Sequence, residues 1–436
     1  MQIEQKLKTN QNPSVCVIGA GPSGLAAIKN LQEQGVSNIT VFEKNDQIGG
    51  NWVYDERNDH SSIYETTHII SSKTLSHYDG FPMPQHYFDY PSHKLVLEYF
   101  QSYAKHFDLN KYIRFNTTVL NAKQLDSKQW QVVYEDAQGI HEECYDYLLV
   151  ANGHHWDPHL PEYPGKFDGE ILHSHQYKKA SVFQNKRVLV VGGGNSACDI
   201  AVEVARVSPQ TCISMRRGCH IFPKFIFGKA ADEAVAKTLW MPDWLRQKLF
   251  SAIIRILQGR YRKYHLMTPD CGPLEIHPTI NSELLYSIRH GKVRPRPGIT
   301  HFEGNKVHFT SGECYEFDTV IFATGYKISF PFFDKDLIDF SGLTKVPLYR
   351  KMMHADFENL YFIGLCQPQG CIWPLADFQS KIVARIIMGT LKRPEQLQQK
   401  IEQEMNNPHY RFKAHTRHAL EVDYHKFRRE LLDMLA

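Results

Sequence analysis

Two glycine-rich turns have the residue types and the spacing that bind a pyrophosphate. Residues 19–24 read Gly-Ala-Gly-Pro-Ser-Gly, and residues 192–197 read Gly-Gly-Gly-Asn-Ser-Ala. The first glycine of such a turn permits a tight bend, the second lets the backbone approach a phosphate, and the small sixth residue lets helix and strand pack closely. The pyrophosphate would lie at the N-terminus of the following helix, where unpaired N–H groups favour anions. Each turn is therefore a candidate dinucleotide site.

A charged residue follows each turn at the same distance and predicts a different nucleotide for each site. Glu43 comes 24 positions after Gly19, and Arg216 comes 24 positions after Gly192. A carboxylate there accepts hydrogen bonds from ribose hydroxyls, as in sites for the adenosine of FAD or for NAD. A guanidinium cannot accept these bonds, but it suits a 2′-phosphate, and Arg217 adds a second one. We therefore expect FAD at the first site and NADPH at the second, with arginines that simply face solvent as the alternative.

Each turn must be held by a parallel sheet. Apolar runs at 14–18 and 187–191 predict buried strands before the turns, and runs at 38–42 and 211–215 predict the next strands. Apolar residues at helical spacing follow both turns. The second unit repeats the layout of the first, with Gly192 in the place of Gly19. A strand before, a helix after and a charge at the right distance are the context that confirms the motif.

A second duplication predicts the domain plan. Residues 146–153 and 318–325 both read Asp, an apolar strand, Ala, any residue and Gly, at an offset of 172. We infer that the chain leaves the first domain after Gly153 and returns near Gly325. The expected fold is α/β, with an FAD-binding domain in two parts, 1–177 and 319–436, and an inserted NADPH-binding domain, 178–318, that carries a helical insertion at about 228–290.

Composition excludes several classes of function. A formal net charge of +3 gives no reason to expect nucleic acid as a partner. No run of about 18 apolar residues predicts a membrane span, and residues 1–13 lack the apolar core of a signal peptide. The nine cysteines are odd in number and dispersed, which predicts free thiols and a cytoplasmic location. Cys366 and Cys371, five apart, are the alternative candidates for a redox disulfide.

Three further motifs resemble those of the flavin-containing monooxygenases, a family that includes N,N-dimethylaniline monooxygenase. They are Phe167-x-Gly169-x-x-x-His173-x-x-x-Tyr177, the Phe-Ala-Thr-Gly-Tyr of 322–326 and the Gly-Gly-Asn-Trp of 49–52. The related Baeyer–Villiger enzymes usually have Trp in place of Tyr177. The resemblance implies a two-dinucleotide-binding-domain flavoprotein, with two Rossmann-like domains that bind FAD and NADPH. We expect His173 to hold the interdomain linker, with direct chemistry as the alternative.

The resemblance also implies the reaction. NADPH reduces FAD, and dioxygen gives a flavin hydroperoxide that oxygenates an amine nitrogen or a thioether sulfur, with indole as a further candidate. The cofactor supplies this chemistry, and accordingly no catalytic residue and no metal site stands out. The expected partners are a small-molecule substrate and dioxygen, and the expected assembly is a homodimer. A pyridine-nucleotide–disulfide reductase would need a cysteine pair after Gly24, which is absent.

One residue departs from the family pattern. Where many members place an asparagine that contacts flavin and nicotinamide, this chain has Ile70, which cannot form a hydrogen bond through its side chain. An uncoupled NADPH oxidase or a redox-sensing flavoprotein is therefore the leading alternative, followed by a Baeyer–Villiger monooxygenase. The full set of candidate cofactor-binding residues is Gly19, Gly21, Pro22, Ser23, Gly24, Glu43, Lys44, Gly50, Asn51, Trp52, Ile70, Ser71, Gly192, Gly194, Asn195, Ser196, Ala197, Arg216, Arg217, Thr324, Gly325 and Gln367.

Overall fold

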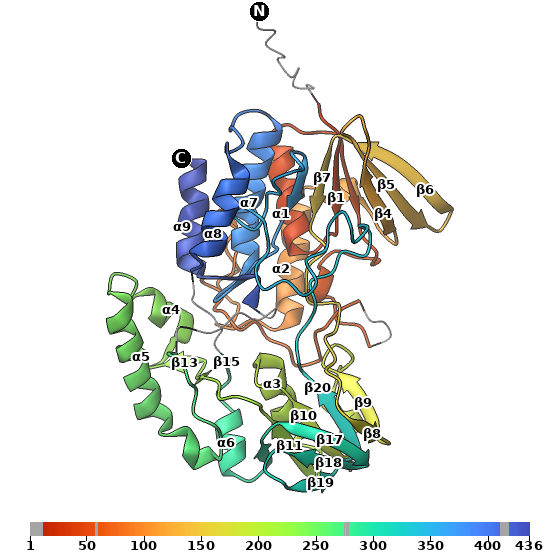
Figure 1. The fold of residues 1–436 in the computed structure, drawn as a ribbon. Coiled ribbons are helices and arrows are strands. Elements are labelled where there is room, and N and C mark those ends of the chain that lie inside the picture. The colour runs from red at the N-terminus through yellow and green to blue at the C-terminus, as the bar shows by residue number, and fades with distance from the viewer. Residues whose placement is uncertain (1–11, 57–59, 274, 276–278, 410–417) are drawn as a thin grey trace, which may run out of the picture.

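Two five-stranded parallel sheets form the centres of two domains (Figure 1). The computed structural model describes residues 12–56, 60–273, 275, 279–409 and 418–436. The first eleven residues, which include most of the segment considered for a signal peptide, lie outside this description. The first sheet has the order β21-β7-β1-β2-β3 and the second β16-β11-β10-β20-β9. Because β1 and β10 occupy the same position between parallel neighbours, the predicted duplication is confirmed.

The strands of the first sheet are β1 (Val15–Ile18), β2 (Ile39–Phe42), β3 (Ile113–Arg114), β7 (Tyr147–Val150) and β21 (Leu360–Phe362). Those of the second are β9 (Glu170–His173), β10 (Arg187–Val191), β11 (Gln210–Ser214), β16 (Val293–Arg296) and β20 (Thr319–Phe322). The four strands predicted around the glycine turns agree closely with β1, β2, β10 and β11. These strands are almost entirely buried, as expected for parallel strands covered on both faces.

Helices cover the first sheet and place the first glycine turn. They are α1 (Pro22–Glu33), α2 (His93–His106), α7 (Ile372–Ile387), α8 (Leu397–Asn406) and α9 (Tyr424–Leu435). Helix α1 begins in the turn itself, with Pro22 at the first helical position, where its missing N–H costs no hydrogen bond. Helix α1 packs along α7, and α9 packs on the other side of α7 (Figure 1).

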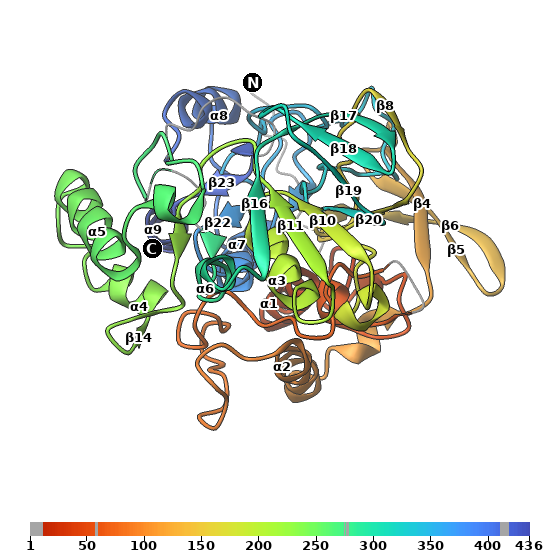
Figure 2. The ribbon, with the colours of Figure 1, turned by 90° about the horizontal axis from the view of Figure 1, so that it is seen from below.

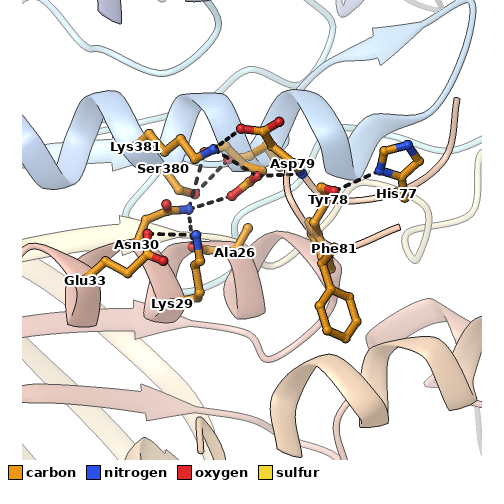
Figure 3. A network of polar contacts seen from close by, with 12 residues as sticks. Ala26, Lys29, Asn30, Glu33, His77, Tyr78, Asp79, Phe81, Ser380 and Lys381 are labelled. Carbon is orange, nitrogen blue, oxygen red and sulfur yellow. Dashed lines mark hydrogen bonds and ion pairs between the residues drawn. The ribbon is translucent and has the colours of Figure 1, made fainter. Parts of the chain in front are cut away.

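A buried polar network fixes α1 against α7 (Figure 3). Asn30 donates to the Asp377 carboxylate over 2.7 Å, and the backbone N–H of Asp79 donates to the same carboxylate over 3.1 Å. Burial raises the pKa of Asp377, which these hydrogen bonds oppose. The Tyr78 hydroxyl donates to the carbonyl oxygen of Pro22 over 2.7 Å. The start of α1, and with it the first turn, is therefore anchored to two distant segments.

Strand pairing moves the predicted domain boundaries. Strand β9 pairs with β20 in the second sheet, and β8 (Gly165–Phe167) pairs with β17 (Ile299–Gly304) in a four-stranded sheet beside it. By strand pairing we therefore propose a second domain from about 165 to 322, compared with the predicted 178–318. The motif that begins at Phe167 therefore forms an edge of the second domain. The chain still passes from the first domain to the second after Gly153 and returns near Gly325, which agrees with the duplicated strand motif.

The remaining strands form small sheets around the two centres. β18 (Lys306–Phe309) and β19 (Cys314–Glu316) complete the four-stranded sheet, and β4 (Thr118–Gln124), β5 (Trp130–Asp136) and β6 (Gly139–Tyr145) form an antiparallel sheet in the first domain. β22 (Gln367–Pro368) pairs with β23 (Glu421–Val422). The 3-10 helices are η1 (Gly50–Trp52), η2 (Asn110–Tyr112), η3 (Ala180–Phe183) and η4 (Tyr261–Tyr264).

The second domain carries α3 (Asn195–Val204) after its glycine turn and a helical insertion. The insertion contains α4 (Ala231–Ala236), α5 (Asp243–Gln258), the hairpin of β13 (Phe225–Ile226) and β14 (Lys229–Ala230), and the pair of β12 (Ile221–Phe222) and β15 (Thr279–Ile280). Figure 2 shows α4 and α5 at one side of the molecule, far from β17 and β18.

Helix α6 (Leu284–Arg289) packs on α3 and β16 and belongs to the domain core. The insertion therefore ends near position 280 rather than at the predicted position 290.

None of the described helices is long and apolar enough to cross a membrane.

Candidate functional site

Both glycine turns open into one large cavity of about 1660 Å³. Its walls come from both domains, because β1 and β10 each end at it. The cavity is lined by every predicted cofactor residue except Gly24 and Ala197. The structure thus brings together two motifs that are far apart in the chain.

The two exceptions have a packing role. A Cβ atom on Gly24 would lie 1.9 Å from the carbonyl oxygen of Gly19, a distance that no side chain tolerates. The Cβ atom of Ala197 lies 3.2 Å from the position that a Cβ atom on Gly192 would take. Both positions therefore hold the helix close to the strand, which is the role that the sequence motif gives to a small residue there.

Bare backbone forms the floor of the first site. Gly50, with φ +53°, crosses Gly21 so closely that a Cβ atom on Gly50 would lie 2.9 Å from the Gly21 Cα atom. Both glycines line the cavity, and φ in this region favours glycine. The crossing leaves main chain without side chains at the start of α1, where a phosphate can come close to the N-terminal N–H groups.

The Glu43 side chain forms hydrogen bonds that stabilise the first turn. Its side chain is only 5% exposed, and its two carboxylate oxygens accept hydrogen bonds from the N–H groups of Ala20, over 2.7 Å, and Asn45, over 2.8 Å. Burial raises the pKa of Glu43, and these two hydrogen bonds and the neighbouring Lys44 oppose the rise. Glu43 lines the cavity, so a carboxylate predicted only to meet ribose also fixes the turn. Lys44 itself lies 5.6 Å from the centre of the Trp156 ring.

Asn51 holds the segment that carries Ile70. Its amide oxygen accepts hydrogen bonds from the backbone N–H of Ser62, over 2.7 Å, and from the Ser62 hydroxyl, over 2.8 Å. Ser71, next to Ile70, shares a 2.7 Å hydrogen bond with Ser76. Trp52 packs edge-on against a second tryptophan of the cavity wall, with ring centres 5.6 Å apart. The wall around Ile70 is thus held at several points.

Two residues of strand β15 form hydrogen bonds with the second turn. The Asn195 side-chain oxygen accepts a hydrogen bond from the N–H of Ile280 over 2.7 Å, and the Thr279 hydroxyl donates to the carbonyl of Gly193 over 2.8 Å. Ser196 is exposed at the start of α3. These contacts hold the turn open toward the cavity rather than against its own strand.

Arg216 and Arg217 lie exposed at the edge of the same cavity. The Arg216 Cγ atom lies 3.4 Å from the position of a Cβ atom on Gly298, so its stem passes close to that backbone. The neighbouring Arg296, by contrast, lies 3.9 Å from the ring centre of Tyr315. Arg216 thus presents an exposed guanidinium at the cavity, directly after the second strand of the nucleotide unit.

The Phe-x-Gly-x-x-x-His motif positions the domains. His173 is 1% exposed and does not line the cavity, and burial lowers its pKa to about 4. Its Nδ1 accepts a hydrogen bond from the N–H of His175 over 3.1 Å, and its ring lies 5.2 Å from that of Tyr326. A neutral, buried histidine next to the returning chain fits the linker role and leaves the alternative of direct chemistry without support.

Two residues, one from this motif and one from the first domain, meet on α3. The Tyr177 hydroxyl donates to Glu203 over 2.8 Å, and the Tyr64 hydroxyl donates to Asp199 over 3.0 Å. The two tyrosine rings lie 5.4 Å apart. Because Tyr64 belongs to the segment that carries Ile70, these bonds tie that segment to the nucleotide helix of the second domain.

The sequence interpretation missed a histidine pair in the cavity wall. His154 and His155 follow strand β7, and Nε2 of each lies 3.1 Å from the side-chain oxygen of Gln367. Burial lowers the pKa of His154. The pair comes directly after the Asn-Gly that ends the first strand duplication, and this position could have marked it. Thr324 and Gly325, at the second copy, bind the backbone of His159.

The predicted alternative of a redox disulfide finds no support. Cys366 and Cys371 are both free and buried, and burial raises the pKa of both thiols. A thiol with a raised pKa is a poor nucleophile at neutral pH. Within the described residues, no group of three or more His, Cys, Asp or Glu side chains could hold a metal ion.

Comparisons with known proteins agree on one family. The family model described as flavin-binding monooxygenase-like matches residues 12–436. Flavin-containing monooxygenase 5 of Homo sapiens is 34% identical over 441 residues, which cover 97% of this chain and 82% of the relative. Dimethylaniline monooxygenase [N-oxide-forming] 2 of Rattus norvegicus is 33% identical, covering 88% and 74%.

Solved structures with the same fold include two oxygenases. S-allyl-L-cysteine S-oxygenase from Allium sativum has a TM-score of 0.72 at 20% identity, covering 97% of this chain and 88% of that one. The open crystal structure of cyclohexanone monooxygenase has a TM-score of 0.73 at 16% identity, covering 98% of both chains. At these identities the two structures support the fold alone.

Proposed function

The chain belongs to the flavin-binding monooxygenase-like family, and from this premise we propose that it is an NADPH-dependent monooxygenase of soft nucleophiles. Its reaction would convert an amine or thioether, dioxygen, NADPH and one proton into the N- or S-oxide, water and NADP⁺. One oxygen atom enters the substrate, and the two electrons from NADPH reduce the other to water. The observation that carries the proposal is the single cavity into which both glycine turns open.

The first site fits FAD. At its base the backbone of Gly50 passes close to that of Gly21, and a Cβ atom added to Gly50 would occupy the space between them. Glu43 fixes the turn and lines the cavity, where its oxygens can accept further hydrogen bonds from ribose hydroxyls. Asn51 and Trp52 continue the wall away from the turn. When bound, the flavin supplies hydride acceptance and dioxygen activation.

The second site fits NADPH. The turn at 192–194 opens toward the cavity, and Arg216 stands at its edge with a guanidinium that suits a phosphate. Tyr64 and Tyr177, bound to α3, set this turn against the first domain. The protein's own contribution is to hold two nucleotides toward one space.

His173 has no role as a proton donor or acceptor in the proposed reaction. It is neutral at physiological pH, because burial lowers its pKa to about 4, and it does not line the cavity. The histidine pair His154 and His155 lines the cavity but is engaged with Gln367. These residues therefore act by position, which agrees with chemistry that resides in the cofactors.

The cysteines support a cytoplasmic location, since those in the described part of the chain form no disulfide. A homodimer remains part of the proposal on the grounds of the family resemblance alone.

The test measures NADPH consumption, peroxide release and product mass together, on amines, thioethers, indole and ketones. The proposal predicts N- and S-oxides whose formation requires both NADPH and dioxygen. Peroxide in place of oxide would establish the uncoupled oxidase, for which Ile70 is the motivating residue. Lactones or esters from ketones, with no S-oxide, would establish a Baeyer–Villiger enzyme.

A further inference from the structure

A second, smaller cavity of about 90 Å³ adjoins the cofactor cavity. We call it the side cavity. Ile70, Ser71 and Gly370 line both cavities. Ile70 is the residue at the position where the family resemblance implies contact with flavin and nicotinamide. The side cavity therefore meets the cofactor cavity where a substrate would have to approach the reacting centre.

Much of the wall of the side cavity is apolar. It is built from the segment before α2, the helical insertion and β15, through Leu75, Phe222, Val235, Leu239 and Ile280. Together with residues 369–370 and 423–425, these stretches enclose the space. Such a wall suits the carbon skeleton of a small molecule and keeps water away from it.

The carboxylates of the side cavity are already engaged by the backbone. Asp232 accepts hydrogen bonds from the N–H of Ser72, over 2.6 Å, and from its hydroxyl, over 2.9 Å. Asp423 caps α9 by accepting from the N–H groups of His425, over 3.0 Å, and Lys426, over 2.9 Å. Both carboxylates therefore have structural roles at the edges of the cavity.

Arg246 is the charged group of the side cavity that has a buried donor without a partner. It lines the side cavity from α5 and is only 9% exposed. Its Nη2 donates to Asp243 over 2.8 Å, and that carboxylate is itself exposed to solvent. Its Nε is buried and has no hydrogen-bond partner among the described residues. A buried guanidinium N–H without a partner is rare in proteins and marks a place where an acceptor is expected.

From this geometry we propose that the side cavity is the substrate site and that Arg246 binds a carboxylate of the substrate. The substrate class is a small thioether or tertiary amine that also carries a carboxylate. The apolar wall holds the carbon chain, and the sulfur or nitrogen lies at the Ile70 end. A guanidinium suits a carboxylate because both are planar and charge-complementary. This inference rests on the proposed monooxygenase function and specifies its substrate.

The opposite ligand class is an ammonium ion held by the acidic residues. His425, which also lines the cavity, favours its neutral form, since burial lowers its pKa. An ammonium ligand would have to share Asp232 or Asp423 with the N–H groups that already donate to them. The observations favour the carboxylate, and the experiment below compares the two classes directly.

The test uses three probes that differ only at one end: 3-(methylthio)propanoate, its primary amide and 3-(methylthio)propylamine. Binding of each to the FAD-loaded protein is measured by calorimetry. The variants are Arg246→Met, which removes the charge, and Arg246→Lys, which keeps it. Arg255→Met is the matched control, because Arg255 is exposed on the same helix and does not line the side cavity.

The wild type should bind the propanoate about 10- to 100-fold more tightly than the amide, as for a charge-assisted hydrogen bond. Arg246→Met should abolish this preference, Arg246→Lys should restore part of it, and Arg255→Met should leave it unchanged. A purely structural role of Arg246 would weaken both probes equally and keep their ratio. Equal binding of acid and amide by the wild type, or tighter binding of the amine, would overturn the inference.

Turnover separates this inference from the proposed function. Sulfoxide formed from the amide with NADPH and dioxygen reports the monooxygenase activity whether or not the acid is preferred. Sulfoxide at equal rates from acid and amide would refute the carboxylate site while leaving the monooxygenase in place. A preference for the acid in calorimetry without any sulfoxide would refute the monooxygenase while leaving the anion site at Arg246.

Discussion

Replacing Arg216 with alanine should remove most of the preference for NADPH over NADH that we propose for this enzyme. Arg216 lies at the edge of the cofactor cavity, its stem beside Gly298 and its side chain exposed. A charge-assisted hydrogen bond to a phosphate contributes about 1.5–3 kcal/mol. Because the site is open to solvent and salt, we expect the lower end of this range, which is roughly a tenfold loss in kcat/KM for NADPH. The value for NADH, which lacks the phosphate, should change little.

The assay compares kcat/KM for NADPH and NADH at low and at high salt, in wild type and variant. High salt should reduce the wild-type preference and leave Arg216→Ala unaffected. Arg217→Ala is the matched neighbour, and it should have a smaller effect if Arg216 is the residue that meets the phosphate. Equal losses with both nucleotides would refute the reasoning, because they would mean that Arg216 supports the fold of the turn rather than reading the phosphate.

Three further predictions concern other parts of the site. Ile70→Asn adds a group that can donate and accept hydrogen bonds, so peroxide released per NADPH should fall, roughly twofold or more; a rise, measured by peroxide assay, would contradict this. Because burial lowers the pKa of His173 to about 4, its folded form binds fewer protons than its unfolded form between pH 6.5 and 4. Its contribution to stability is thus complete above pH 6.5 and is lost as the pH falls through 4. In urea unfolding, the free energy of unfolding of His173→Gln should fall less than that of the wild type between pH 6.5 and 4, by at most about 3 kcal/mol. The same pH profile in variant and wild type would contradict this prediction. Gly24→Ala places a methyl group 1.9 Å from the Gly19 carbonyl oxygen and should weaken flavin retention, whereas Gly35→Ala, with nothing within 4 Å, should retain flavin despite its positive φ.

The sequence predicted the two central units because their constraints are local. Turn, strand, helix and terminal charge follow one another within a single short stretch of chain, and each has a physical reason at its position. The strands and helices on either side of Gly19 and Gly192 therefore agree with their predicted positions. The two exceptions among the candidate residues, Gly24 and Ala197, are those that the motif assigns to packing.

Contacts between residues far apart in the chain could not be predicted from the sequence. The short strands β8 and β9 belong to the second domain because they pair with β17 and β20, which come much later in the chain. Their pattern alone does not show which sheet they join. The same holds for Glu43, whose carboxylate binds the turn that precedes it, and for Arg246, which lines one cavity with Ile70. The proposed substrate site is assembled from several distant segments and has no signature in any one of them.

The most direct test of the central claim is isotopic. The purified protein, with its flavin and NADPH, is supplied with a thioether under ¹⁸O₂ in ordinary water, and the sulfoxide is analysed by mass spectrometry. The account predicts one ¹⁸O atom in the sulfoxide, with the label insensitive to added catalase. Sulfoxide that disappears with catalase, or peroxide as the sole oxygen product, would contradict it and identify an oxidase instead.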